Sequence, residues 1–265
     1  FLMLFIVAGT FAVVYGILYV ANLIHPVLRF CLETFFIYQI LATKSLKTES
    51  MKVYKKLKEG DLIGARKEVS YLVGRDTENL DESEVAKADV ETIAENTADG
   101  VIAPMLFIAI GGAPLGFAYK AVNTLDSMVA YKNEELINIG FFSAKMDDIC
   151  NFIPARFAAV MLMIASLILR FDFKGAVKIF KRDRFAHLSP NSAQTEAVAA
   201  GALQIQLGGT HNYFGKAVVK PTIGDDIRPV EYEDIKRTNQ LLYVSAVLSM
   251  AVCCLITFLI YVQLF

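Results

Sequence analysis

Apolar residues gather into long uncharged runs at both ends of the chain. Residues 1–24 and 241–265 contain no Asp, Glu, Lys or Arg. A helix needs roughly 20 apolar residues to cross a hydrocarbon core, so each run can span a membrane. We expect another span at residues 153–169, an apolar run with Arg156 near its start.

Two further apolar segments do not suit an ordinary span. Residues 27–43 carry Arg29 and Glu33 four positions apart, a spacing that allows pairing on one face of a tilted or interfacial helix. Residues 101–119 are uncharged but include two prolines and three glycines, which disfavour a helix interior. Irregular backbone at membrane depth persists where protein or a cavity covers it. We therefore expect a re-entrant or broken segment; a continuous kinked span is the alternative.

The polar connecting segments also predict helices. Residues 44–67 favour a basic helical hairpin that is broken near Gly60 and Asp61. Asp81 and Glu84 have the spacing of a capping box that opens a helix running to about Asn96, and Gly100 is a suitable stop. Residues 197–207 are apolar but too short to cross, which favours a buried helix.

These elements predict an all-α, polytopic membrane protein forming a single domain over residues 1–265, with polar helical excursions. The composition agrees, since 55% of the 265 residues are hydrophobic and the mean hydropathy is +0.46. The formal net charge of −1 and the lack of a basic helix with interleaved aromatics exclude nucleic acid as a partner. The chain begins at Phe rather than Met, so we expect further residues upstream.

The first two groups of polar residues that could carry chemistry lie on predicted helices. Glu84, Lys87, Glu91 and Glu95 form one charged stripe, and Asn96 and Asp99 follow it. A solvated helix face is the plainer interpretation of this stripe. Lys120, Asn123, Asp126 and Ser127 form the second group, whose oxygens converge on one helical face and suit Mg²⁺. Its plainer interpretation is a polar helix end.

The other two groups contain cations and glycines. Asp147, Asp148 and Asn151 precede Arg156, an ionisable residue entering an apolar run and hence a functional candidate unless it forms a structural Arg–Asp pair. His187, Ser189 and Asn191 are followed by Gly208-Gly209 and Lys216, and adjacent glycines allow close approach of a phosphate. The four groups together favour metal-assisted chemistry on phosphates or carboxylates and leave the substrate open.

Five stretches carry a resemblance to a known family: GRDTENLDESEVAKADVETIAENTADGVIAP (74–104), GGAPLGFAYKAVNTLDSM (111–128), KMDDICNFIPAR (145–156), RDRFAHLSPNS (182–192) and AGALQIQLGGTHNYFGK (200–216). In order and spacing they resemble the CbiB/CobD family of cobalamin biosynthesis, the adenosylcobinamide-phosphate synthases. The chain departs from the family's pattern at Ala193 and Gln194, where glycine and an aromatic are usual. It also lacks the family's aspartate- and HPV-containing motif before the first apolar run.

The resemblance implies an ATP-dependent amide-forming ligase. Its substrates would be adenosylcobyric acid and (R)-1-amino-2-propanol O-phosphate, or a related amino-alcohol phosphate, and its product would be adenosylcobinamide phosphate. ATP would activate the corrinoid carboxylate as an acyl phosphate, with Mg²⁺ and cationic side chains offsetting the phosphate charges. The apolar runs predict a multi-pass protein of the cell membrane, and the basic loops that flank them favour a cytoplasmic active site. A homo-oligomer is one arrangement open to it.

The same resemblance assigns roles to the polar groups, which we expect to gather in one pocket beside the lipid. The catalytic candidates are Glu91, Glu95, Asp126 and Asp148. The metal-binding candidates are Asp99, Asp126, Asp147 and Asp148. The substrate-binding candidates are Arg75, Asn96, Lys120, Asn123, Arg156, His187, Ser189, Asn191 and Lys216.

Two other classes of protein remain as alternatives. A different Mg²⁺-dependent membrane transferase acting on a lipid phosphate is one, although the chain shows no Asp-rich repeat of that kind. A membrane transporter or a non-catalytic AmpE-like membrane protein is the other. Transporters often carry broken helices at matching positions of two halves, whereas this sequence has a single broken segment.

Overall fold

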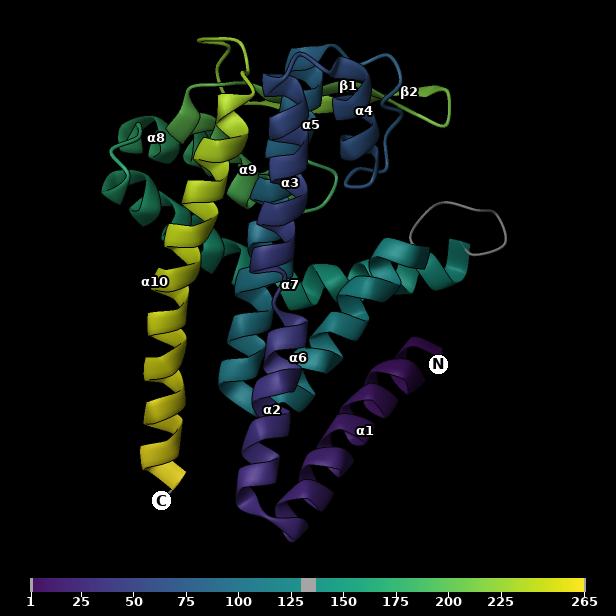
Figure 1. Ribbon diagram of the computed structural model, residues 1–265, viewed down its shortest axis with the longest axis vertical. Helices are drawn as coiled ribbons and strands as arrows, with labels where there is room; N and C mark the ends of the chain where they lie inside the picture. Colours follow the sequence, from purple (N-terminus) through teal and green to yellow (C-terminus); the bar gives the residue numbers. More distant parts are fainter. Residues whose placement is uncertain (1, 130–136, 265) are drawn as a thin grey trace. The chain divides into compact units, whose positions relative to one another are not determined.

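The computed structural model describes residues 2–129 and 137–264, and it is mostly helical (Figure 1). Within these residues, four helical stretches are long and apolar enough to cross a membrane: Met3–Ile24, Glu82–Met128, Gly140–Ile168 and Tyr232–Ile260. The chain divides into two compact units. Unit 1 comprises residues 1–42, 99–154 and 249–265, and unit 2 comprises residues 43–98 and 155–248. The expectation of a single domain stays a prediction.

Unit 1 is built from apolar helices. Its elements are α1 (Leu2–Ile24), α2 (Pro26–Ile40), α6 (Ala103–Val129), the first part of α7 (Ile137–Ile168) and the last part of α10 (Glu233–Leu264). His25 caps α2 by accepting a hydrogen bond from the Val27 amide at 3.1 Å. Val14, Leu18 and Ala113 are buried together, which joins α1 to α6.

The glycine-rich segment folds back on itself as a helical hairpin, the form expected of a re-entrant segment. Gly111 and Gly112 break α6, and Gly112 has φ 67° and ψ −165°, a conformation essentially restricted to glycine. The rings of Phe107 and Tyr119 stack with centroids 4.8 Å apart. Residues twelve apart on one continuous helix would be about 18 Å apart along its axis. The two limbs therefore fold back on each other, as Figure 1 shows, and the kinked-span alternative is excluded.

The hairpin tip is held by a charged side chain of α2. Oε1 of Glu33 accepts a hydrogen bond from the Ala113 amide at 3.4 Å, at the start of the second limb. The first amides of a helix have no partner within the helix, so a carboxylate there satisfies a donor that would otherwise be costly to bury. The expected pairing of Arg29 with Glu33 is also present, with 3.7 Å between Nε and Oε2.

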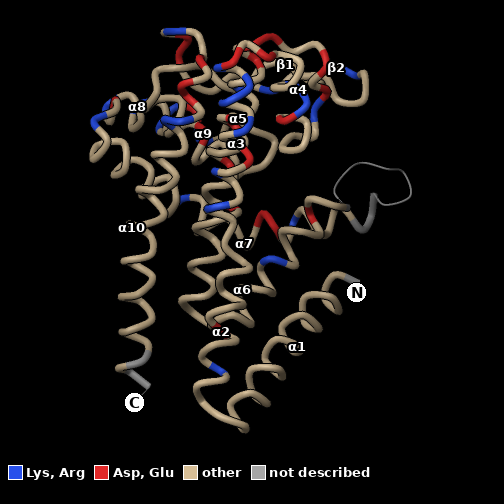
Figure 2. Tube along the Cα trace, viewed as in Figure 1, with Lys and Arg blue, Asp and Glu red and all other residues tan. Residues whose placement is uncertain are grey.

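Unit 2 carries most of the polar excursions. Its helices are α3 (Thr43–Lys58), α4 (Leu62–Ser70), α5 (Glu82–Asn96), the second part of α7, α8 (Phe173–Asp183), α9 (Ser192–Leu203) and the first part of α10. Figure 2 shows charged residues on α3, α4, α5 and α8, whereas α1 carries none. The hairpin of α3 and α4 breaks at Gly60 and Asp61 as expected. Every residue of α9 is buried, which confirms the buried helix over residues 197–203. Its expected end at residue 207 is wrong, because α9 ends at Leu203 and Leu207 begins strand β1.

The capping box at the start of α5 is present, but the expected stop at Gly100 is wrong. The helix continues as a π-helix, η1 (Thr97–Ile102), and runs on into α6. A π-helix widens the turn and leaves carbonyls free for other donors. The Gly100 carbonyl accepts a hydrogen bond from the Ala42 amide at 3.1 Å, so a distant segment stabilises the irregular turn.

A two-stranded antiparallel sheet is the exception to the expected all-α content. Its strands are β1 (Leu207–Tyr213) and β2 (Lys216–Ile223). Phe214 and Gly215, the two residues of the turn, have φ of 52° and 75°, and two such residues match the twist of a tight hairpin. Asp76 accepts hydrogen bonds from both turn amides, at 3.0 and 2.8 Å. The turn therefore depends on a carboxylate far away in sequence.

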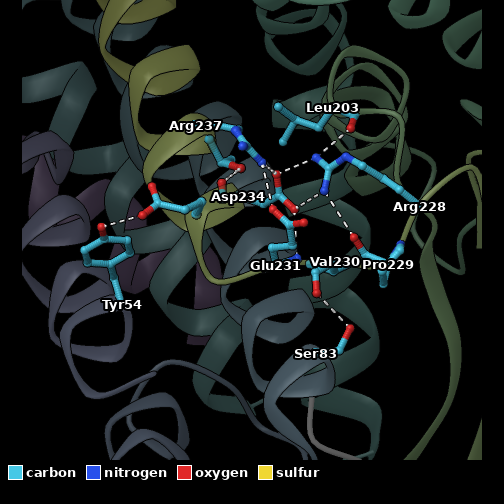
Figure 3. A network of polar contacts seen from close by, with 11 residues as sticks. Tyr54, Ser83, Leu203, Arg228, Pro229, Val230, Glu231, Asp234 and Arg237 are labelled. Carbon is cyan, nitrogen blue, oxygen red and sulfur yellow. Dashed lines mark hydrogen bonds and ion pairs between the residues drawn. The ribbon is translucent and has the colours of Figure 1, made fainter. Parts of the chain in front are cut away.

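A buried carboxylate organises the start of α10 (Figure 3). The side chain of Asp234 is fully buried and accepts hydrogen bonds from the guanidinium groups of Arg228 and Arg237 and from the Glu231 amide. Arg228 also donates to the Leu203 carbonyl at 2.8 Å. This network ties the end of α9 to the segment that enters α10.

The re-entrant hairpin should be sensitive to a single methyl group at Gly112. A Cβ there would lie 2.6 Å from Oε1 of Glu33, and the backbone conformation disfavours any other residue. We expect Gly112→Ala to destabilise the fold by about 1–3 kcal/mol. Gly9→Ala is the matched control, because a Cβ at Gly9 would meet no atom within 4 Å. Equal thermal unfolding temperatures of the two variants in detergent would contradict the role of Gly112.

The Asp234 network should also be measurable by unfolding. Asp234→Asn removes the charge that pairs with two arginines and leaves them without a buried counter-ion, which should cost roughly 3 kcal/mol. Asp225→Asn serves as control, since Asp225 pairs with the more exposed Lys178 and Arg182. We expect the control to change stability by less than about 1 kcal/mol. Similar denaturation midpoints for the two variants would contradict this difference.

Candidate functional site

Glu91 of α5 is the centre of a polar cluster in unit 2. One oxygen of its carboxylate pairs with Arg75, and the other accepts a hydrogen bond from the Gly208 amide at 2.7 Å. Nη1 of Arg75 lies 2.8 Å from Nδ1 and 2.9 Å from Nε2 of His211. The loop before α5, α5 itself and strand β1 thus meet at one carboxylate, and the solvated-face interpretation of the α5 stripe is wrong at this position.

A second carboxylate of α5, Glu95, lies one turn after Glu91 and has an acidic neighbour on α9. Glu95 accepts a hydrogen bond from the Ser192 hydroxyl at 2.8 Å, which links α5 to the first residue of α9. Glu196, one turn into α9, is only 5% exposed and interacts electrostatically with Glu95, Glu91 and Lys220. Neither Glu196 nor Lys220 was among the expected site residues. The available signal was a glutamate directly before the apolar run of residues 197–203, where an ionisable residue is costly to bury.

Two lysines add positive charge to this group. Lys87 of α5 interacts with Glu91 and Arg75, and its Nζ lies 3.9 Å from the place that a Cβ on Gly209 would occupy. Gly209 has φ 100°, a backbone conformation that favours glycine. Lys220 of β2 lies over the ring of Tyr213, 5.3 Å from its centroid.

The loop between α8 and α9 contributes the expected His187, Ser189 and Asn191. Nδ1 of His187 accepts a hydrogen bond from the Ser189 amide at 3.0 Å, and the Ser189 hydroxyl accepts one from the Asn191 amide at 3.3 Å. The Asn191 side-chain oxygen accepts from Arg156 at 3.3 Å. These contacts connect the loop to α7, and Asn191 is one partner of Arg156.

Burial and neighbouring charges set the protonation of the cluster. Burial and the Arg75 guanidinium lower the pKa of His211 to about 4. Burial, and then the Glu95 and Glu91 carboxylates, raise the pKa of Glu196 well above its ordinary value. Burial alone would lower the pKa of Lys220, but the Tyr213 hydroxyl and nearby carboxylates raise it overall. At neutral pH His211 is therefore neutral and Lys220 is charged.

Unit 1 holds a smaller polar cluster between α6 and α7. The Tyr119 hydroxyl lies 3.0 Å from the Asp99 carbonyl oxygen and 2.8 Å from the Asn151 side-chain oxygen. Asn151 donates to one oxygen of Asp147 at 3.0 Å, and Asn123 donates to the other at 3.4 Å. Lys120 interacts electrostatically with Asp99. Members of the first three groups of polar residues therefore come together within unit 1: Asp99 of the first, Lys120 and Asn123 of the second, and Asp147 and Asn151 of the third.

The acidic residues of this cluster do not form a ready-made metal cage. In residues 2–129 and 137–264, no group of three or more His, Cys, Asp or Glu side chains is arranged to hold a metal ion. Mg²⁺ is usually held by one or two carboxylates together with substrate phosphates. The assignment of Asp99, Asp126, Asp147 and Asp148 to a metal therefore stays a prediction and would need oxygens from a bound phosphate.

The remaining expected residues have simpler surroundings. Asp148 lies 3.9 Å from Lys145 on the same helix face, and Asp126 is half-buried on α6. The side-chain amide of Asn96 donates to the Thr92 carbonyl within α5 at 2.9 Å. Lys216 is exposed at the start of β2. The expectation that residues of both units share one pocket stays a prediction.

The helices and the two clusters define a polytopic membrane protein with charged groups gathered by distant segments of the chain. Residues 1–242 match the family described as CobD/Cbib protein. The chain is 54% identical to "Cobalamin biosynthesis protein CobD" of Clostridium perfringens, over 97% of this chain and 81% of that protein. It is 48% identical to "Cobalamin biosynthesis protein CbiB" of Salmonella choleraesuis, over 93% of this chain and 77% of that protein.

These similarities cover nearly the whole chain, and the chain belongs to the CobD/CbiB family. A third relative, the CobD of Streptococcus sanguinis, is 54% identical over 87% of this chain and 73% of its own length. No solved structure matches the chain.

The low pKa of His211 predicts a pH dependence of stability. Its ordinary pKa is 6.5, whereas in the fold it is about 4, so the unfolded chain binds more protons between these values. The stabilisation is present above pH 6.5 and is lost as the pH falls toward 4. In His211→Asn we expect the unfolding temperature in detergent to fall less steeply between pH 7 and pH 4.5. Part of the slope should remain, because burial also lowers the pKa of His187. Identical slopes would remove His211 as its source.

Proposed function

We propose that this protein forms an amide between an amino-alcohol phosphate, typically (R)-1-amino-2-propanol O-phosphate, and a carboxylate of adenosylcobyric acid. The product would be adenosylcobinamide phosphate, and ATP when bound would supply the activation of the carboxylate. Family membership supports a role in cobalamin biosynthesis, since the relatives are named for that pathway. The apolar helices support a multi-pass protein, which we place in the cell membrane with its active site on the cytoplasmic side.

The observation that carries this proposal is the set of cations beside strand β1. Arg75, Lys87 and Lys220 come from three separate segments, and each interacts with carboxylates of the unit 2 cluster. Gly208 and Gly209 both have positive φ, which brings backbone to the cluster without side chains in the way. Paired guanidinium donors and ammonium groups are the usual protein ligands of phosphate. We assign this group to a phosphate of the amino-alcohol substrate or of ATP.

His187 would act as a donor to substrate. Because its Nδ1 accepts the Ser189 amide, a neutral His187 carries its proton on Nε2. Burial lowers the pKa of His187, which favours this neutral form at pH 7. A ring with Nε2–H can donate to a phosphate or carboxylate oxygen but cannot accept a proton there. The role of general base therefore falls to another residue.

Glu95 and Glu196 are the groups that we assign to proton transfer. Amide formation requires the substrate ammonium to lose a proton before its nitrogen attacks the activated carbonyl carbon, and the group bound to that carbon then leaves. Glu196 has a raised pKa because it is buried beside Glu95 and Glu91, and a base is most effective when its pKa approaches the working pH. Glu95, held by Ser192, is the neighbouring carboxylate that can share the proton.

The test is an assay of amide formation by the purified protein with ATP, Mg²⁺, adenosylcobyric acid and the amino-alcohol phosphate. We expect Lys220→Gln to raise KM for the phosphate-bearing substrate about 10- to 100-fold, the effect of one charge-assisted hydrogen bond. We expect Glu196→Gln to lower kcat about 10²- to 10⁴-fold with little change in KM. Each variant changes one charge at nearly constant volume.

Lys181→Gln on α8 is the matched control, since Lys181 is exposed and lies outside the cluster. It should keep the wild-type kcat and KM. Wild-type kinetics in Lys220→Gln and Glu196→Gln would contradict the assignment of the unit 2 cluster. Binding of both substrates without product under any condition would contradict the amide-forming activity itself.

A further inference from the structure

Unit 1 contains a cavity that the proposed activity does not use. It has a volume of about 580 Å³ and lies between α1, α2, the tip of the α6 hairpin and α10. Most of its walls are apolar, but Asn22, Arg29 and Glu33 also line it. Arg29 and Glu33 are the charged residues of α2, a helix that is otherwise predominantly apolar. An ion pair in such a segment is costly unless it has a structural or binding role.

An apolar groove adjoins this cavity. It has a volume of about 540 Å³, and Met105, Met250, Cys254 and Phe258 are among the residues that line it. The two spaces share four lining residues, Ile37, Ile108, Ala109 and Thr257. We call the two adjoining spaces together the compartment. No charged side chain lines the groove, so the charge of the compartment lies on the cavity side.

The charged end offers both signs of charge. The side chain of Arg29 is 49% exposed, and that of Glu33 is 25% exposed. Arg29 contacts Glu33 through Nε at 3.7 Å, a geometry that leaves the terminal guanidinium nitrogens available to another acceptor. The Ala113 amide holds Glu33 in place, as described above. The compartment thus presents a fixed carboxylate, a partly free guanidinium and an apolar extension.

We propose that this compartment binds a phospholipid with a primary-amine, zwitterionic headgroup. The phosphate lies at Arg29, the ammonium group approaches Glu33, and an acyl chain occupies the apolar groove. A headgroup with phosphate and no cation would be repelled by Glu33, and a quaternary ammonium has no N–H to donate to it. A small soluble phosphate would leave the groove unfilled. The assignment is independent of the amide-forming reaction and of the unit 2 cluster.

Lipid binding to the purified protein tests this inference directly. After delipidation in detergent, phosphatidylethanolamine, phosphatidylcholine and phosphatidylglycerol with identical acyl chains are titrated, and bound lipid is counted by native mass spectrometry. We expect phosphatidylethanolamine to bind at least about tenfold more tightly than the other two lipids. Similar affinities for all three lipids would overturn the headgroup assignment. Phosphoethanolamine without acyl chains should bind far more weakly, and equal binding of it would overturn the lipid assignment.

Three variants separate the two ends of the compartment. Arg29→Gln removes the phosphate contact and keeps Glu33, which holds the hairpin tip. It should weaken phosphatidylethanolamine binding about tenfold or more. Cys254→Trp fills the groove and should weaken all lipids while leaving the charges unchanged. Lys52→Gln, which breaks an exposed ion pair with Glu49 on α3, is the matched control and should bind like wild type. Unchanged lipid binding in both Arg29→Gln and Cys254→Trp would overturn the proposal.

Discussion

The pairing of Glu91 with both Arg75 and the Gly208 amide is the contact on which the unit 2 cluster depends. A carboxylate this deeply enclosed is tolerated only when donors replace the water that it has lost. Arg75, in the loop before α5, and the Gly208 amide of strand β1 supply these donors. Strand β1 also positions His211 beside Arg75. One buried charge therefore fixes the geometry of three segments. Burial, and then the neighbouring charges of this cluster, lower the pKa of His211 and raise that of Glu196.

In the apolar unit 1, the re-entrant hairpin also requires partners for polar groups that have lost their contact with water. Breaking a helix at Gly111 and Gly112 exposes amides that lipid cannot satisfy, and Glu33 supplies the acceptor for one of them. The hairpin also places Tyr119 where its hydroxyl meets Asn151 of α7. Asn151 and Asn123 then hold Asp147 by both of its oxygens. Satisfaction of polar groups, more than apolar packing alone, thus explains how α6 and α7 bring their carboxylate and amides together.

The sequence predicted elements well where the signal was local. Uncharged runs, the Asp81–Glu84 capping box and the break at Gly60 depend on neighbours within a few residues, and each is present. The stop at Gly100 was wrong because a distant amide, that of Ala42, stabilises the π-helix. The sequence did not predict the β-hairpin, because the hairpin also depends on a distant residue. Its turn needs Asp76, more than a hundred residues earlier, to satisfy two amides.

By itself the sequence determined that this is a helical membrane protein of the CobD/CbiB type, and it named Arg75, Glu91, Glu95 and His187 as candidates. Those conclusions rest on residue type and spacing, which the chain carries locally. Only the tertiary structure decided that Glu196 and Lys220 belong with them, that Glu33 caps the hairpin tip, and that Lys216 lies exposed. The physical reason is that burial and charge pairing depend on which segments meet, and residues far apart in sequence give no local sign of that.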